Sequence, residues 1–454
     1  MCNIRKGAIC MEKEKILEML ENREFKEIKD ELENMHPVDV AEMLEEFDDK
    51  QMILIFRLLA KDEAAETFTE MTADMREVIL KALTDSEIKE FMDEMYLDDA
   101  VDVLEELPAN VVDRLMKMTD AETRVQINTL LNYPEDSAGS IMNVEYIAFN
   151  KEMTVEDAIL RIRQVGLNRE TIYTCYVLEK RKLIGAVSLK ELLTSGDNRT
   201  IEDIMETNIL YVNTHDDQEE VVSLISKYNL IAMPVVDNDM RMVGIVTVDD
   251  AMDVMEEEAT EDMSMMVGIS PSEDSYFDTT IWEHAKSRFP WLLFLMLSAT
   301  LSGLALGKFE YAIVAMPILN SFVPMLTGTG GNCGSQSSTL IIRGLATDEI
   351  EFRDIFRVIF KELRVAALVG TMLAVVNGIR IMLMYSGEMK LAITLGITII
   401  CTVILAKVIG CALPLVAKKV GLDPALMAAP LITTLVDTGT ILLYFTIATT
   451  IMKI

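Results

Sequence analysis

The stretch Pro430–Tyr444 reads PLITTLVDTGTILLY and places Asp437 in the middle of an apolar run. The run is long enough for a membrane-spanning helix, which needs about 20 mostly apolar residues. A carboxylate at that depth costs roughly 3 kcal/mol even on the scale from insertion experiments, so such residues usually serve a function. The stretch therefore predicts a membrane protein with Asp437 at an internal polar site. The alternatives are a structural hydrogen bond or an ion pair with Lys407 or Arg380.

Charge divides the chain near Pro290 into two unlike parts. Residues 1–290 hold 65 acidic and 29 basic side chains, a net charge of -36, whereas residues 291–454 hold 9 and 12, a net of +3. An acidic field of this size repels nucleic acid, so we expect cations and no nucleic acid as partners. The chain opens without a secretory signal pattern, which predicts that the acidic part stays in the cytosol.

Cysteine and histidine give no sign of a metal or catalytic centre. The six cysteines (Cys2, Cys10, Cys175, Cys333, Cys401 and Cys411) show no CxxC spacing, and the chain has only three histidines. We therefore expect reduced, unpaired thiols and no zinc site. The sequence also lacks a nucleophile with a base at catalytic spacing and a Walker motif, so we expect no catalytic residues and no enzyme.

Beyond Pro290 the apolar runs predict five membrane spans. Their approximate bounds are 285–306, 311–342, 362–385, 390–416 and 424–452, and the second is overlong and broken by glycines in its second half. Basic residues gather between spans two and three and between spans four and five (Arg343, Arg353, Arg357, Lys361, Arg364, Lys418 and Lys419). The positive-inside rule therefore places the N-terminal part in the cytosol and the C-terminus outside.

After a short tail, residues 1–10, the segment 11–135 is rich in Glu, Leu, Met and Ala with helical spacing of its apolar positions. Similar phrases recur every 24 residues: VAEMLEEF from Val40, AAETFTEM from Ala64, IKEFMDEM from Ile88 and VDRLMKMT from Val112. Twenty-four residues accommodate two short helices and their turns. We therefore predict an all-α domain of stacked helical hairpins, with methionines filling its core.

Two α/β units follow, in residues 136–199 and 200–250. TIYTCYVLEKRKLIGAVSLKELL begins at Thr171 and LIAMPVVDNDMRMVGIVTVDDAM at Leu230, each after a helical segment. The pair resembles tandem CBS domains. That family's G-hh-[ST]-x-x-D phrase appears as Gly244, Thr247 and Asp250, and as Gly185, Ser188 and Glu191. The resemblance makes Thr247, Asp250 and Ser188 candidates for binding ATP or another adenine nucleotide, although Glu191 departs from the pattern.

A connecting segment, residues 251–282, is strongly acidic. The phrase DDAMDVMEEEATEDM starts at Asp249, and as a helix it places Asp250, Asp253, Glu257 and Glu261 along one side. Like charges at this spacing destabilise a helix unless something neutralises them. A solvated acidic helix is the plain alternative, but the position just before the first span favours a divalent-cation site.

The second span ends in LTGTGGNCGSQSSTLIIRG, Leu326–Gly344. Its glycines suggest a phosphate-binding loop, but no Gly-Lys-Ser/Thr follows and the segment continues an apolar span. Glycines and small polar residues in a span allow close helix approach and can line a wet cavity. We therefore weigh a pore-lining role against packing alone.

The order of domains, with GTGGNCGSQ in span two and GLDPAL...PLITTLVDTG in span five, resembles the MgtE family of magnesium transporters over essentially the whole chain. The resemblance implies a homodimeric, Mg²⁺-selective, channel-like pore in the cell membrane, within a multidomain protein whose residues 283–454 form five transmembrane helices. It assigns Asp437 to the ion site and Asn332, Gly331 and Gly330 to its neighbourhood.

The resemblance also implies that internal Mg²⁺ binds the cytosolic domains and closes the pore. The candidate ligands are acidic residues of the connecting helix and its surroundings (Asp423, Asp249, Asp250, Asp253, Glu257, Glu258, Glu261, Asp262, Glu219 and Asp98). Two alternatives stay open: a carrier coupled to Na⁺ or H⁺, and a less selective transporter of Mn²⁺, Co²⁺ or Ca²⁺.

Overall fold

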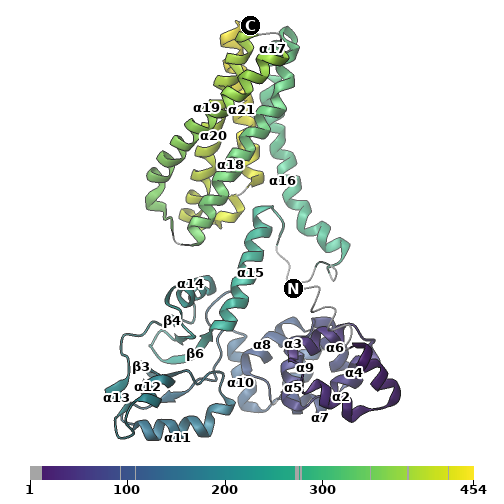
Figure 1. Ribbon diagram of the computed structural model, residues 1–454, viewed down its shortest axis with the longest axis vertical. Coiled ribbons are helices and arrows are strands. Elements are labelled where there is room, and N and C mark those ends of the chain that lie inside the picture. The colour runs from purple at the N-terminus through teal and green to yellow at the C-terminus, as the bar shows by residue number, and fades with distance from the viewer. Residues whose placement is uncertain are drawn as a thin grey trace. The chain divides into compact units, whose positions relative to one another are not determined.

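The computed structural model describes residues 13–92, 94–107, 109–270, 276, 279–347, 349–385, 388–427 and 429–453. The predicted tail, residues 1–10, with Cys2 and Cys10, lies outside this part. The chain forms two compact units that meet in sequence between Met255 and Glu256, within helix α15. The four described cysteines are free thiols, as expected. Figure 1 shows the elements of each unit.

The first unit begins with short helices that confirm the 24-residue repeat. The odd-numbered helices α3 to α9 begin at residues 37, 61, 85 and 109, and the even-numbered helices α4 to α10 begin at 49, 73, 97 and 121. The helices are α2 (Phe25–Leu32), α3 (Pro37–Glu45), α4 (Asp49–Phe56), α5 (Lys61–Thr69), α6 (Ala73–Ala82), α7 (Asp85–Met92), α8 (Leu97–Glu106), α9 (Ala109–Met118) and α10 (Ala121–Leu130). Each repeat is therefore one pair of helices.

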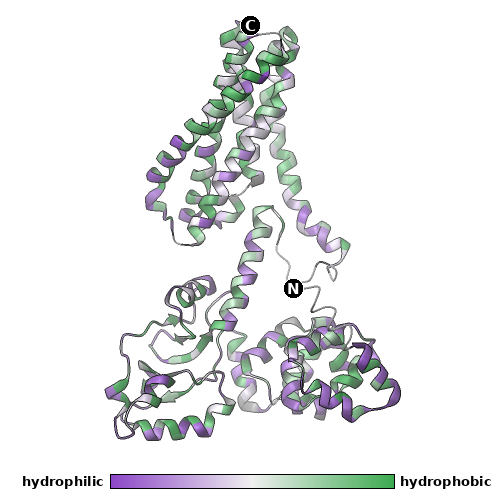
Figure 2. Cartoon of the chain, viewed as in Figure 1, coloured by the Kyte–Doolittle hydropathy of each residue, from purple (hydrophilic) through white to green (hydrophobic). Residues whose placement is uncertain are grey.

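These helices bury one apolar stripe each, which Figure 2 shows as alternating apolar and polar faces. The rings of Phe56, Phe68 and Phe91 meet at centroid distances of 5.0 to 6.1 Å and connect successive repeats. Met43 and Met52 are almost completely buried. Methionine therefore fills the core here, as predicted.

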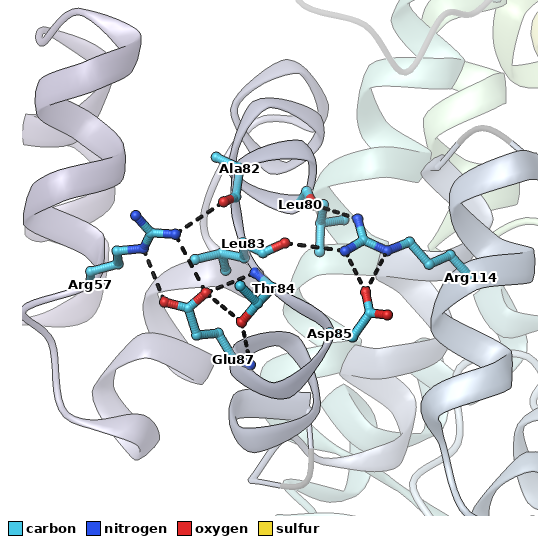
Figure 3. A network of polar contacts seen from close by, with 8 residues as sticks. All are labelled: Arg57, Leu80, Ala82, Leu83, Thr84, Asp85, Glu87 and Arg114. Carbon is cyan, nitrogen blue, oxygen red and sulfur yellow. Dashed lines mark hydrogen bonds and ion pairs between the residues drawn. The ribbon is translucent and has the colours of Figure 1, made fainter.

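Two arginines fasten neighbouring repeats by binding the exposed carbonyls at the end of α6 (Figure 3). Arg57 donates to the carbonyl oxygen of Ala82 at 3.0 Å and forms an ion pair with Glu87 at 3.1 Å. Arg114 donates to the carbonyl oxygens of Leu80 and Leu83. Because the last four carbonyls of a helix have no partner inside it, these arginines satisfy groups that would otherwise need water.

Two similar α/β units follow, as predicted. Each has a three-stranded sheet in which the first strand runs parallel to the second and the second antiparallel to the third. The first α/β unit contains β1 (Ala148–Phe149), α11 (Val155–Val165), η1 (Gly166–Asn168), β2 (Thr174–Glu179), β3 (Lys182–Ser188) and α12 (Leu189–Thr194). The second α/β unit contains α13 (Ile201–Ile204), β4 (Val212–Asn213), α14 (Gln218–Tyr228), β5 (Ala232–Val236), β6 (Met242–Thr247) and the start of α15 (Val248–Met266).

The second unit is a bundle of long apolar helices, which stand out in Figure 2. It contains α16 (Ile281–Gly307), α17 (Glu310–Ala315), η2 (Pro317–Phe322), α18 (Val323–Ala346), η3 (Phe352–Asp354), α19 (Ile355–Met384), α20 (Met389–Val420), η4 (Pro424–Met427) and α21 (Ala429–Met452). Among the described residues, four helices are long and apolar enough to cross a membrane: α16, α19 with its preceding turn, α20 and α21.

The predicted second span, residues 311–342, is wrong as one helix. The break falls at Met316–Pro317 rather than at the glycines, since Met316 has a non-helical backbone and proline cannot donate the hydrogen bond that would continue α17. The helix α18 then continues through its glycines to Ala346. The predicted fifth span also begins later, because Pro424–Met427 forms a 3₁₀ turn before α21.

The helix α20 packs against α18, α19 and α21. Its contact with α18 is unusually close, because a β-carbon at Gly410 would lie 2.3 Å from the carbonyl oxygen of Gly334. Glycine at both positions lets the two backbones touch. The glycine-rich sequence of α18 therefore serves helix packing along this face.

Candidate functional site

Asp437 lies on α21 and is half-buried. Its Oδ1 atom is buried without a hydrogen-bond partner in the part of the chain that the structure describes, and so is Oγ1 of Thr440, one turn further along the helix. An unpartnered buried carboxylate oxygen is costly, and it marks a place where an ion or water can bind. The position is therefore a candidate cation site.

The glycines of α18 stand against the part of α21 that flanks Asp437. A β-carbon at Gly330 would lie 2.8 Å from Cγ1 of Val436 and 3.1 Å from Oγ1 of Thr440. A β-carbon at Gly331 would lie 3.0 Å from Cγ2 of Thr433. The structure thus places Gly330 and Gly331 beside the helix that carries the aspartate, whereas the side chain of Asn332 is exposed.

The two basic residues considered as partners of Asp437 have other neighbours. Lys407 forms an ion pair with Glu362 at 3.1 Å. Arg380 contacts the sulfur of Met325 through Nη2. Among the described residues Asp437 forms no ion pair, so the structure does not support the alternative of an ion pair with Lys407 or Arg380.

A second group of carboxylates forms inside the first unit, around Asn143. This side chain is fully buried. Its amide donates to Oδ2 of Asp98 at 2.9 Å and to Oε2 of Glu170 at 3.1 Å. Its backbone pairs with Ile245 of β6, the strand that leads into α15. Asn143 therefore connects the helical repeats with both α/β units.

Burial and mutual repulsion raise the pKa values of these carboxyl groups well above those of free carboxyl groups. Burial, with the charges of Asp99, Asp250 and Glu170, raises the pKa of Asp98 to about 8. Burial and Asp250 raise the pKa of Asp99 to about 6, and burial with Asp250 and Asp249 raises that of Glu170 to about 7. Burial also raises the pKa of Asp250. A bound divalent cation would relieve this repulsion.

These raised pKa values predict how the first unit responds to pH. Unfolded carboxyl groups release their protons near pH 4. The folded state therefore binds more protons than the unfolded state between about pH 4 and pH 8, and its stability falls as pH rises through that window. In the chain without divalent cations we expect a loss of several degrees in the melting temperature of this unit, since roughly 1 kcal/mol corresponds to about 2–4 °C for a domain of this size.

The measurements are the melting temperature and the hydrogen-exchange protection factors of the amides of α8 and α15 in the full chain, with EDTA, at pH 5.5 and at pH 8. Saturating Mg²⁺ should reduce the difference, because the cation replaces the lost protons as the neutralising charge. Protection that rises with pH in EDTA would contradict the prediction.

A third acidic group lies in the second unit, at the end of α15. Burial and the charges of Asp423 and Glu258 raise the pKa of Asp262. Asp423 precedes η4 and accepts a hydrogen bond from the backbone N–H of Ala425 at 2.7 Å. The structure thus brings Asp423 to two predicted Mg²⁺ ligands, Glu258 and Asp262, that are neighbours on α15 but far from it in the sequence.

The remaining acidic candidates lie on exposed or partly buried helix faces. Asp253 and Glu257 are exposed on α15, Glu261 is half-buried there, and Glu219 is exposed in the first turn of α14. Among the described residues no three His, Cys, Asp or Glu side chains already have metal-binding geometry. Mg²⁺ retains several waters and needs few direct protein ligands, so such a cluster is no precondition for binding it.

The nucleotide candidates have local roles in the structure. The hydroxyl of Thr247 donates to Oδ2 of Asp250 at 2.5 Å at the start of α15, and Ser188 and Glu191 form a capping box on α12. Ser188 also borders a mainly apolar pocket, lined by Tyr173, Ser188, Leu189, Lys190, Leu193, Thr194 and Ile231. The G-hh-[ST]-x-x-D phrase is therefore explained locally as a helix start.

Four polar residues of these clusters are not predicted from the sequence: Asp99, Glu170, Asn143 and Glu362. Two of them could have been found in the sequence. Asp99 follows the candidate ligand Asp98 in the first turn of α8, and Glu362 is a charged residue at the edge of an apolar run. Glu170 and Asn143 lie in irregular segments. Only the tertiary structure brings them to the carboxylate group.

Family models match three parts of the chain. A divalent cation transporter model, MgtE, matches residues 323–447, an MgtE intracellular N domain model matches 35–136, and the CBS domain model matches 138–196 and 201–257. The magnesium transporter MgtE of Thermus thermophilus is 35% identical over 96% of this chain and 97% of its own length. That of Bacillus subtilis is 32% identical over 94% of each chain.

The chain belongs to the MgtE family of magnesium transporters. MgtE proteins transport Mg²⁺ across a membrane and are not enzymes, so the resemblance seen in the sequence is confirmed. Two solved structures are similar to about half of the chain. One is the cytosolic domain of the Mg²⁺ channel MgtE in complex with ATP, with 35% identity, a TM-score of 0.50 and coverage of 52% of this chain and 98% of that one. The other is the soluble part of a magnesium transporter, with 30% identity, a TM-score of 0.52 and coverage of 55% and 99%.

Proposed function

We propose that the chain forms a homodimeric, Mg²⁺-selective, channel-like pathway in the cell membrane and that cytosolic Mg²⁺ closes it. The observation that carries the proposal is the unpartnered carboxylate oxygen of Asp437, beside the glycine face of α18 in an apolar bundle. Family membership identifies Mg²⁺ as the transported cation, and this carboxylate is the binding position that we propose for it.

Mg²⁺ prefers six oxygen ligands at about 2.0–2.1 Å and gives up its waters reluctantly. A permeation site should therefore offer few direct ligands and room for retained water. One Asp437 from each of two subunits meets that requirement, and the shared cation offsets the cost of burying the two carboxylates. In this proposal α18 also crosses the membrane, as the second of five spans in chain order beside α16, α19, α20 and α21, with residues 1–282 in the cytosol and the C-terminus outside.

For gating, we assign the two cytosolic acidic groups to Mg²⁺ sensing. The first is Asp98 with Asp249, Asp250 and Glu170, and the second is Asp262 with Glu258 and Asp423. Without Mg²⁺ the carboxylates within each group repel one another. The cation favours whichever arrangement binds more of it, so rising internal Mg²⁺ populates the compact, closed state.

We also propose that the CBS pair binds ATP or another adenine nucleotide. Support comes from the related cytosolic domain solved with ATP. In this chain the pocket at Ser188 and the segment at Thr247 and Asp250 are the candidates. Isothermal titration of ATP into the full chain tests this, with guanosine triphosphate as the control for base selectivity.

The decisive experiment is transport by the purified protein in liposomes. A channel should give Mg²⁺ currents that follow the electrochemical gradient without Na⁺ or H⁺, and Mn²⁺, Co²⁺ and Ca²⁺ should pass at most about a tenth as well. Flux that needs a Na⁺ or H⁺ gradient would identify a coupled carrier. Equal flux of all four cations would identify an unselective transporter.

Removing residues 1–262 tests the sensor. We expect Mg²⁺ uptake to continue and the half-inhibitory internal Mg²⁺ concentration to rise at least tenfold, because the deletion removes the whole first acidic group and leaves only Asp423 of the second. The measurement is current against internal Mg²⁺ in excised patches, with the full chain as control. Inhibition at the original concentration would sink the gating scheme.

A further inference from the structure

Three polar side chains meet inside the bundle, where α18, α19 and α20 contact one another. The ammonium of Lys407 donates to Oγ of Ser337 at 2.9 Å and to Oε2 of Glu362 at 3.1 Å. The hydroxyl of Ser337 donates to the same carboxylate oxygen at 2.6 Å. The side chains of Lys407 and Glu362 are only 7% and 12% exposed. This triad is thus a charge pair held almost entirely out of solvent.

The triad adjoins the helices of the candidate ion site. Ser337 follows Gly334 by one turn of α18, and a β-carbon at Gly334 would lie 2.6 Å from Cγ2 of Ile432 and 3.3 Å from the carbonyl oxygen of Ala406. Lys407 is the residue after Ala406. Six residues separate Gly331 from Ser337, which is about 9 Å along a helix at 1.5 Å per residue. The ammonium therefore lies on the order of 10 Å from the level of the site, by the same helical rise.

We propose that the negative charge of Glu362 cancels the positive charge of Lys407, so that the lysine does not repel a cation that passes Asp437. The lysine holds Ser337 and so fixes α18 against α20, but its charge would repel a cation at Asp437. The inference rests on the proposed function, because it assumes that Mg²⁺ passes this site. It goes beyond that proposal by giving a positioning pair an electrostatic role in cation passage.

Charge and distance make the effect large. The rise gives the axial offset, and neighbouring helix axes lie about 8–10 Å apart, so the two charges are on the order of 13 Å apart. At an effective dielectric of about 20 they still interact appreciably, and the energy doubles for a divalent ion. An unpaired Lys407 should therefore slow Mg²⁺ at least tenfold. Losing the lysine instead leaves an unpaired carboxylate, which attracts cations. The two single variants thus have different expected effects on flux: a large loss without Glu362 and little loss without Lys407.

A purely structural lock gives a different pattern. Either single change leaves one buried charge unpaired, and both should lower the stability of the bundle by similar amounts. If the triad only holds the helices together, both variants should also lose flux together. Stability and flux therefore separate the two roles.

The test compares Glu362→Gln, Lys407→Met and the double variant in liposomes, with flux normalised to monodisperse protein and melting temperature measured in detergent. We expect Glu362→Gln to lose at least tenfold in Mg²⁺ flux, Lys407→Met to keep at least half, and the double variant to recover to within about threefold of the original chain. Equal losses in both single variants, or no recovery in the double variant, would overturn the proposal.

Two controls keep the result interpretable. If the unaltered chain carries no Mg²⁺, the proposed function itself fails; if it does and Glu362→Gln is normal, only the present inference fails. Should Glu362→Gln not fold, the other two variants decide, because flux below a third of the original in Lys407→Met contradicts an electrostatic role.

Discussion

Replacing Asp437 with asparagine is expected to abolish Mg²⁺ flux, with a loss of at least a hundredfold in liposomes. Asparagine has nearly the same shape, so the packing of α21 against α18 should persist while the charge that offsets cation dehydration disappears. An intramembrane carboxylate also costs stability, so the variant should be at least as stable as the original chain.

The matched control is Thr446→Val on the same helix. Thr446 is exposed and its hydroxyl bonds only the carbonyl of Leu442 among the described residues, so its flux should stay within about twofold. Flux of Asp437→Asn within threefold of the control would refute the ion-site assignment. A parallel loss of melting temperature would instead assign the aspartate to structure.

Replacing Gly410 with alanine should have the largest effect on the fold of the bundle. The new β-carbon would lie 2.3 Å from the carbonyl oxygen of Gly334, and both atoms belong to backbones that cannot move independently. Overpacking of this kind costs about 1–3 kcal/mol or more. We expect a lower melting temperature and at least a tenfold loss of flux, since α18 must shift along with Gly330 and Gly331.

The control is Gly378→Ala on α19, where a β-carbon would meet nothing within 4 Å. Alanine favours a helix over glycine by up to about 1 kcal/mol, so this variant should be equally or more stable. Measurements are the yield of monodisperse protein, its melting temperature and its Mg²⁺ flux. A Gly410→Ala protein with normal melting and flux would show that α18 and α20 do not need this contact.

Several features could be predicted from the sequence because their signals are local. The 24-residue repeat appears in the sequence, since each pair of helices repeats its own apolar pattern. The tandem α/β units likewise follow from strand and helix patterns in order along the chain. Asp437 is visible as a charge in an apolar run, because a membrane helix needs almost continuous apolar sequence.

Other features depend on contacts between distant segments. Pro317 is visible in the sequence, but the glycines of α18 predict the break there. Only the packing of α18 against α20 and α21 shows why these glycines continue a helix. Likewise, the sequence offered Lys407 as a partner for Asp437, whereas the fold pairs it with Glu362.

The sequence by itself thus determined the order of domains, the apolar helices and the position of the aspartate that we propose for the ion site. The tertiary structure decided which charges meet: Asp98 with Asp250 and Glu170 around Asn143, and Glu362 with Lys407. The physical reason is range. Helical periodicity and hydropathy act between neighbours in the chain, whereas burial and charge repulsion depend on which segments the fold brings within a few ångströms.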